Sequence, residues 1–325
     1  MLRMAMLNTN INIFHHPTTA LFLDDDSDFF TNIYFKIAKH VRCKYYDNPN
    51  AALSMSQLPF KNFQSDFPSE FPSNTPVHDA LFNSYKPLDE RRFREPSVFV
   101  IDYAMPGING LEVCEKVTNP YIKKILLTGV ADEKIAIEAL NEGLIDYYVH
   151  KQEENLIQRL ALVIQKQQKK YFNDIIKNYP IYHEPSYIKD PAFSRYFLEI
   201  CEQYNIVEYY FMDNPMGFLL VTKKGQALVL LAYTDEQVET HVDDCRNQNA
   251  PDALLTQLIA RQNIPLFHDS PYYCYEKILH NWSSYLYPVT TVSGKDSYYC
   301  SLIQNLDTKA LLTGYKDVIL GTVNK

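Results

Sequence analysis

Residues 97–110 read SVFVIDYAMPGING, and this stretch decides the fold of the first half of the chain. A run of apolar and β-branched residues ends abruptly at Asp102, and residues 105–107 then force a tight loop. Continuous apolar runs of this kind are typical of strands that are buried on both faces of a parallel sheet. Because open α/β folds keep their sites at the carboxyl edge of the sheet, we expect Asp102 to lie exposed at that rim.

Three other short apolar runs end on polar side chains in the same way. These runs, with the side chains that follow them, are residues 20–23 with Asp24 and Asp25, residues 122–127 with Thr128, and residues 145–149 with Lys151. Because parallel strands end at one edge of a sheet, we expect the carboxylates, the hydroxyl and the amine to converge. Three acidic side chains would form a hard-oxygen site of the kind that holds Mg²⁺, and Thr128 and Lys151 could complement an added phosphoryl group.

The order of these motifs resembles the receiver domain of two-component response regulators. The resemblance covers residues 17–171 and rests on four motifs: the Asp24 and Asp25 pair, the Asp102 loop with its MPG, LLTG at residues 126–129, and DYYVHK at residues 146–151. It implies an α/β fold with a five-stranded, doubly wound parallel sheet, whose helices we expect at residues 28–41, 50–58, 111–117 and 132–142.

The resemblance also implies a role for each residue of the predicted site. Asp102 would accept phosphate from a histidine kinase or phosphotransfer protein. The Mg²⁺ ligands would be Asp24, Asp25, Asp102 and the backbone carbonyl of Ala104. Thr128 and Lys151 would bind phosphoryl oxygens, and Tyr148 would turn inward as the switch residue.

Spacing and proline content indicate the domain organisation. Asp24 and Asp102 are 78 positions apart, whereas the intervening elements of such a domain need about 45 to 50 residues at ordinary lengths. The excess predicts an insertion at about residues 59–87, which is rich in proline and phenylalanine. The expected parts are an N-terminal extension (1–19), the receiver domain (20–153), a connecting helix (154–179) and an output domain (180–325).

The second half predicts a smaller α+β output domain with an antiparallel sheet. Alternating apolar runs and turn residues predict strands at residues 207–212, 218–222, 227–233, 287–292 and 298–304, and helices at residues 193–204, 235–244 and 252–260. The last two strands are expected to form one hairpin around residues 293–296.

Charge and motifs limit what the output domain does. Residues 181–325 carry 11 Lys and Arg against 17 Asp and Glu, a net of −6, which is not the basic footprint of a DNA-binding domain. No phosphate-binding glycine loop or cyclic-dinucleotide motif is present, so we expect a noncatalytic output and no enzyme. The alternatives are a transcription factor that binds DNA through an unusual fold, and a ligand-sensing domain lined by tyrosines and Trp282.

The pattern of the whole chain is similar to orphan response regulators of α-hydroxyketone quorum-sensing circuits. That similarity implies dimerisation on phosphorylation, through the long connecting helix, and control of gene expression. The apolar runs are far too short to cross a membrane, and the N-terminus has no signal-peptide core. We therefore expect a cytoplasmic protein.

Overall fold

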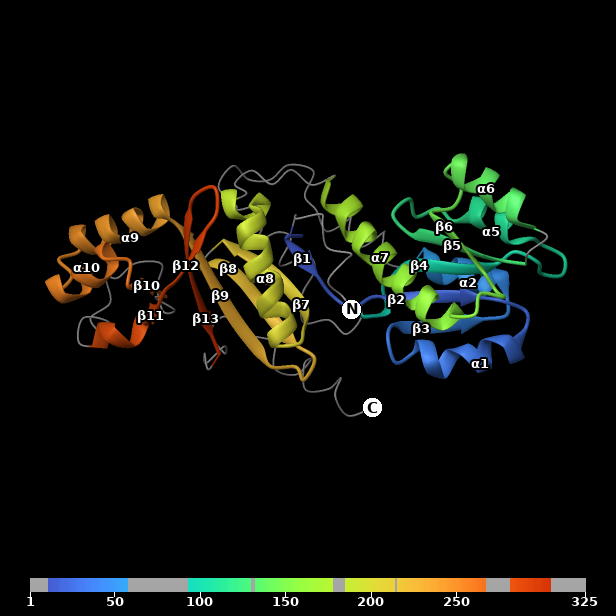
Figure 1. Ribbon diagram of the computed structural model, residues 1–325, viewed down its shortest axis with the longest axis horizontal. Helices are drawn as coiled ribbons and strands as arrows, with labels where there is room; N and C mark the ends of the chain where they lie inside the picture. The colour runs from blue at the N-terminus through green and yellow to red at the C-terminus, as the bar shows by residue number, and fades with distance from the viewer. Residues whose placement is uncertain are drawn as a thin grey trace. The chain divides into compact units, whose positions relative to one another are not determined.

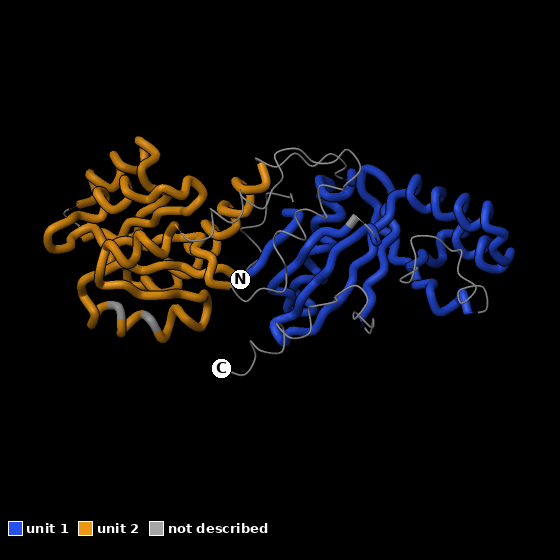
Figure 2. Tube along the Cα trace, turned by 180° about the vertical axis from the view of Figure 1, so that it is seen from behind, with its two compact units in different colours: residues 1–16, 71–89, 181–325 blue, residues 17–70, 90–180 orange. Residues whose placement is uncertain are grey.

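The computed structural model describes residues 11–57, 93–129, 132–177, 185–213, 215–266 and 281–304 (Figure 1). The predicted insertion at residues 59–87 lies outside this part of the chain. Two compact units are present (Figure 2). The first comprises residues 17–70 and 90–180 and is the orange part, keyed as unit 2; the second comprises residues 1–16, 71–89 and 181–325 and is the blue part, keyed as unit 1. Of the helices that are described, none has the length and apolar character needed to cross a bilayer.

The first unit contains the five-stranded parallel sheet that the sequence predicts. Its strands, in spatial order, are β3 (Arg42–Tyr46), β2 (Thr19–Leu23), β4 (Pro96–Asp102), β5 (Lys123–Thr128) and β6 (Tyr147–His150). All four strand pairs are parallel. Every residue of β2 and β4 is buried, since helices cover both faces of the sheet (Figure 1). This order is the doubly wound arrangement in which ligands bind beyond the carboxyl ends of the strands.

The helices of this unit begin and end near their predicted positions. They are α1 (Ser27–Ile37), α2 (Pro49–Ser56), α5 (Gly110–Lys116), α6 (Glu133–Asn141) and α7 (Leu156–Lys177). Helix α1 ends four residues earlier than the apolar stripe predicts, yet Val41 is still buried in the core. Gly143 follows α6 with a φ of 73°, the left-handed conformation that commonly ends a helix.

The connecting helix α7 packs along the receiver sheet over most of its length. Leu160, Val163 and Ile164 belong to the same buried cluster as the sheet strands. Further along, the Asp174 carboxylate lies 2.7 Å from the Nζ of the buried Lys123. The helix is therefore part of the receiver core as well as the connection to the next unit.

The second unit is an α+β fold with an antiparallel sheet. Its six-stranded sheet has the order β1 (Phe14–His15), β7 (Ile206–Asp213), β8 (Met216–Thr222), β9 (Ala227–Thr234), β13 (Ser297–Ile303) and β12 (Thr290–Ser293). A second sheet pairs β10 (Asn263–Pro265) with β11 (Leu286–Pro288). The helices are α8 (Pro191–Gln203), α9 (Asp235–Asn247) and α10 (Asp252–Ile259), with short 3₁₀ turns η3 (Ser186–Lys189) and η4 (Trp282–Tyr285).

Two pairings in this unit differ from the sequence expectation. Residues 287–292 were expected to form one strand of a hairpin, but β11 ends at Pro288 and pairs with β10, and only β12 pairs with β13. The Val289 N–H still donates to the carbonyl of Gln262, 3.0 Å away, so the chain changes partners between Val289 and Thr290. The other difference is β1, in which Phe14 and His15 pair with Tyr210 and Tyr209 of β7.

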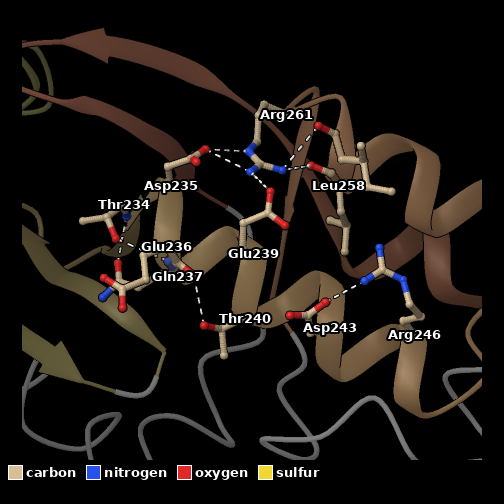
Figure 3. Close-up of polar contacts among 11 residues, drawn as sticks. Thr234, Asp235, Glu236, Gln237, Glu239, Thr240, Asp243, Arg246, Leu258 and Arg261 are labelled. Atoms are coloured by element: carbon tan, nitrogen blue, oxygen red, sulfur yellow. Dashed lines mark hydrogen bonds and ion pairs between the residues drawn. The ribbon is translucent and has the colours of Figure 1, made fainter.

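Arg261 joins helices α9 and α10 in the second unit (Figure 3). Its guanidinium donates to the Asp235 carboxylate, with the Nε to oxygen distance 3.0 Å, and to the Glu239 carboxylate. It also donates to the backbone carbonyl of Leu258, 3.1 Å away, near the end of α10. Arg261 itself has a φ of 55°, so the chain leaves α10 in a left-handed turn that this network holds.

Asp190 connects the start of α8 with the β12–β13 turn. Its carboxylate accepts hydrogen bonds from the backbone N–H of Ala192 (2.7 Å) and of Lys295 (2.6 Å), and from the Tyr298 hydroxyl (2.8 Å). A Cβ at Gly294 would lie 2.3 Å from this carboxylate, so the turn can approach it only with glycine at that position. Burial alone raises the pKa of Asp190, but these hydrogen bonds outweigh it and lower the pKa below its ordinary value.

We expect Asp190→Ala to lower the free energy of unfolding of the second unit by about 2 to 4 kcal/mol, because it removes a helix cap and leaves buried donors without an acceptor. Trp282 is the single tryptophan of the chain and lies in this unit, so its fluorescence during urea unfolding reports the change.

Asp252→Ala is the matched control, because Asp252 begins α10 without capping it by a side-chain hydrogen bond. Asp252→Ala should lower the free energy of unfolding by less than about 1 kcal/mol. Asp190 should make its full contribution to the free energy of unfolding at neutral pH, and this contribution should decline as the pH falls below 3.8. The reason is that the pKa of Asp190 is lower in the folded state than in the unfolded state. Equal costs for the two variants would contradict the role assigned to Asp190.

Candidate functional site

Three carboxylates gather at the carboxyl edge of the parallel sheet. Asp24 directly follows β2, Asp25 comes next, and Asp102 is the last residue of the neighbouring β4. One oxygen of each carboxylate lies within 4.8 Å of the others. Adjacent parallel strands that stop at the same level bring these side chains together, as the spacing predicts.

Asp102 is buried, in contrast to the expectation that it would be exposed at the rim. Its exposed fraction is 5%, and that of Asp24 is 3%, whereas Asp25 is exposed. The Lys151 ammonium lies 3.0 Å from Asp102 Oδ1 and 2.7 Å from Asp24 Oδ2. It also lies 4.5 Å from the centre of the Phe29 ring, which adds a cation–π contact. Lys151 therefore bridges two carboxylates that would otherwise repel each other.

The loop after β4 approaches the strand end very closely. The backbone N–H of Gly110 donates to the carbonyl of Tyr103, 2.9 Å away, and a Cβ at Gly110 would lie 2.4 Å from the carbonyl oxygen of Asp102. Helix α5 then starts with a capping box between Asn109 and Glu112. Ala104, whose carbonyl was predicted as a ligand, lies exposed in this loop.

Backbone and side-chain hydrogen bonds hold Asp24 in place. Its Oδ1 accepts from the backbone N–H of Asp26 (2.9 Å), so the acidic run folds into a tight turn. The Tyr45 hydroxyl donates to the backbone carbonyl of Asp24 (2.5 Å), and the Asp24 N–H donates to the carbonyl of Tyr46 (3.2 Å). Both tyrosines belong to β3, so three adjacent strands fix the position of the carboxylates.

Thr128 and Tyr148 both contact a histidine that the sequence analysis did not select. Thr128 ends β5 and is fully buried, and its Oγ1 lies 3.1 Å from Nδ1 of His150. The half-buried Tyr148 contacts the same imidazole edge to face, with ring centres 5.6 Å apart. Alternation along β6 was the available signal, because it places residues 148 and 150 on one face of the strand.

The charges of the site act on one another. Burial raises the pKa of Asp102 to about 6; the hydrogen bond from Lys151 opposes this rise, and the charges of Asp24 and Asp25 add to it. Burial by itself would lower the pKa of Lys151, but its hydrogen bonds to Asp24 and Asp102 outweigh burial and raise it. Lys151 therefore stays a cation, and three carboxylates against one ammonium leave the ionised site with a charge of −2.

The donor set suits a hard divalent cation. The three carboxylates offer oxygen ligands within one small space, and oxygen ligands of this kind are those that Mg²⁺ prefers. The exposed Asp25 leaves one side of the site open to solvent, as an ion that keeps several waters requires. The residues present therefore fit Mg²⁺.

Comparisons with known proteins agree with this geometry. The response regulator receiver domain model matches residues 75–161, which include Asp102, Thr128 and Lys151. A search of curated proteins found no match.

Among solved structures, the Legionella pneumophila response regulator LqsR matches with 30% sequence identity and a TM-score of 0.73, over 91% of this chain and 90% of that one. An adenylate cyclase from Rhodopirellula baltica (19% identity, TM-score 0.35) covers 50% of this chain and 99% of its own. A receiver domain protein from Clostridium thermocellum (18% identity, TM-score 0.33) covers 49% of this chain and 98% of its own. The last two similarities are too low to carry an argument about function. The LqsR match spans nearly all of both chains, so this chain belongs to the response regulator family.

Proposed function

We propose that this response regulator is phosphorylated on Asp102 in the presence of Mg²⁺ and passes the signal on by dimerising. The observation that carries the proposal is the bridge from Lys151 to Asp24 and Asp102, within a group of three carboxylates at the carboxyl edge of the sheet. This arrangement supports an acceptor carboxylate, a metal site and a cation for the transferred group in one place.

The chemistry of the proposed transfer follows from the positions of these groups. An oxygen of the Asp102 carboxylate forms a bond to phosphorus, and the bond from phosphorus to the donor histidine nitrogen, or to the oxygen of a small acyl phosphate, breaks. The Lys151 ammonium, already 3.0 Å from Asp102, pairs with a phosphoryl oxygen, and the Thr128 hydroxyl donates to another. Asp24, Asp25, Asp102 and the Ala104 carbonyl would hold Mg²⁺, which would supply positive charge against the charge on the transferring group.

The partner that fits this site is a histidine kinase or phosphotransfer protein, since the acceptor is a carboxylate that needs an activated phosphoryl donor. We propose that the kinase belongs to an α-hydroxyketone quorum-sensing circuit, which the likeness to LqsR over 90% of that chain supports. The output domain would then act without catalysis to control gene expression. Its net charge of −6 over residues 181–325 favours a protein partner over DNA.

Exposed apolar side chains on α6 support dimerisation on that face of the receiver. Ile137 is 40% exposed and Leu140 is 37% exposed, one helical turn apart. Helix α6 follows the strand that ends at Thr128, so movement of that strand end can reach the helix. Phosphorylation would bias the face formed by α6, β6 and α7 toward a second copy.

Metal binding gives the first prediction for this proposal. Asp24→Asn should weaken Mg²⁺ binding at least about tenfold, because it replaces one anionic ligand with a neutral one. Isothermal titration of the native chain and the variant with Mg²⁺ measures this. Asp132→Asn is the control, because Asp132 lies outside the group of three carboxylates. The Mg²⁺ affinity of this variant should match that of the native chain. Equal affinities for all three proteins would contradict the metal site.

Phosphorylation gives the second prediction. Incubation with acetyl phosphate and Mg²⁺ should add one phosphoryl group to the native chain, as seen by intact-mass spectrometry, and none to Asp102→Asn. Lys151→Ala should reduce the yield strongly, because the transferred group loses its cation and two carboxylates lose their bridge. Labelling of Asp102→Asn at the native level would place the acceptor elsewhere.

Dimerisation gives the third prediction. Mg²⁺ with beryllofluoride should raise the mass of the native chain in light scattering toward that of a dimer, and should leave Asp102→Asn unchanged. Ile137→Asp should abolish the increase, because it places a charge on the apolar face of α6. Ile259→Asp is the matched control, since Ile259 is 52% exposed in the other unit. An unchanged mass for the native chain would remove dimerisation as the output.

A further inference from the structure

His150 contacts both Thr128 and Tyr148, and the proposed function leaves it without a role. Thr128 and His150 are partners across the parallel pair β5 and β6. The Thr128 Oγ1 lies 3.1 Å from Nδ1 of His150, while the Nε2 on the other side of the ring lies 3.9 Å from the Glu133 carboxylate at the start of α6. The ring is therefore held between the end of β5 and the first residue of α6.

The Thr128 hydroxyl has a single proton to donate. Thr128 is fully buried, so its hydroxyl needs a partner within the protein, and the His150 imidazole is that partner. A phosphoryl oxygen on Asp102 accepts hydrogen bonds but donates none once it is ionised. Where the imidazole accepts the Thr128 proton, the phosphoryl group and His150 compete for the same donor.

We propose that His150 is a positioning residue that holds the Thr128 hydroxyl in the resting state and so opposes capture of the phosphoryl group. The proposal rests on the proposed function, because it assumes that Thr128 binds a phosphoryl oxygen. When the hydroxyl turns toward the phosphoryl group, the imidazole loses its partner on one side. The ring also contacts Tyr148, with centres 5.6 Å apart, and lies beside Glu133 of α6. Release of Thr128 therefore frees the ring that packs against the proposed switch residue.

Substitution of His150 separates its hydrogen bond from its packing. His150→Phe keeps an aromatic ring beside Tyr148 but cannot accept or donate, so the resting hydroxyl loses its partner. His150→Gln keeps polar atoms that can bond the hydroxyl. With Mg²⁺ and beryllofluoride as the probe, His150→Phe should bind beryllofluoride about fivefold more tightly than the native chain, which corresponds to the net worth of one hydrogen bond, about 1 kcal/mol. His150→Gln should stay within about twofold of the native value.

The same pair of measurements in a Thr128→Val background tests whether His150 acts through the hydroxyl. Without that hydroxyl, His150→Phe should change the beryllofluoride affinity by less than about twofold. A purely structural effect of the ring would persist in this background and would overturn the proposal. So would unchanged or weaker binding by His150→Phe alone.

A measurement on the native chain keeps the proposal testable if His150→Phe does not fold, which circular dichroism would reveal. The ¹⁵N resonance of His150 Nδ1 should shift when beryllofluoride is added, because the bonded hydroxyl leaves, and should not shift in this way in Thr128→Val. Beryllofluoride binding without any shift at Nδ1 would overturn the role of His150 alone. A native chain that binds no beryllofluoride and takes no phosphoryl group would overturn the proposed function, and this inference with it.

Discussion

The Lys151 ammonium and the two buried carboxylates beside it are the interaction on which the receiver site depends. Asp24 and Asp102 are 3% and 5% exposed, and they are held at the ends of adjacent strands that are buried along their whole length. Two like charges in such a place would favour protonation of one of them, and burial already raises the pKa of Asp102 to about 6. The ammonium, within 3.0 Å of both, opposes that rise. The Lys151 ammonium thus favours the ionised form of the Asp24 and Asp102 carboxylates, and the buried strands β2 and β4 keep the two carboxylates close together.

The pairing of β5 with β6 connects this electrostatic centre to the rest of the receiver. Lys151 follows the last residue of β6, and its backbone N–H donates to the carbonyl of Thr128 (3.0 Å). The same strand carries Tyr148 and His150 on one face. Any group that draws Lys151 or Thr128 toward Asp102 therefore acts on neighbouring positions of two paired strands, and α6 begins shortly after one of them. A local change in charge at Asp102 has a short covalent and hydrogen-bonded route to the outer helices.

The sequence predicted those parts of the fold that depend on local pattern. Apolar runs ending on polar residues located four of the five receiver strands, all but β3, and their shared direction predicted that Asp24, Asp25, Asp102 and Lys151 would meet. The features that the sequence did not predict depend on contacts between segments that are distant along the chain. Asp102 is buried beside Lys151, which lies 49 positions away in the sequence, and β1 is two residues long, with no periodicity of its own. The exchange of partners after Pro288 and the bond between Thr128 and His150 likewise require knowledge of which strands are neighbours.

The connectivity of β1 bears on how the two units are coupled. The chain forms the edge strand of the six-stranded sheet at Phe14–His15, enters the receiver sheet at Thr19, and is again part of the second unit beyond α7. The receiver is therefore covalently joined to the second unit at both of its ends. A division of the chain at residue 180 alone would remove β1 from the sheet that it completes, exposing the backbone donors and acceptors along one edge of β7. A change inside the receiver can act through the backbone at both ends of this unit, the segment between β1 and β2 and the helix α7, whereas a receiver that simply precedes its output domain is joined to it at one end.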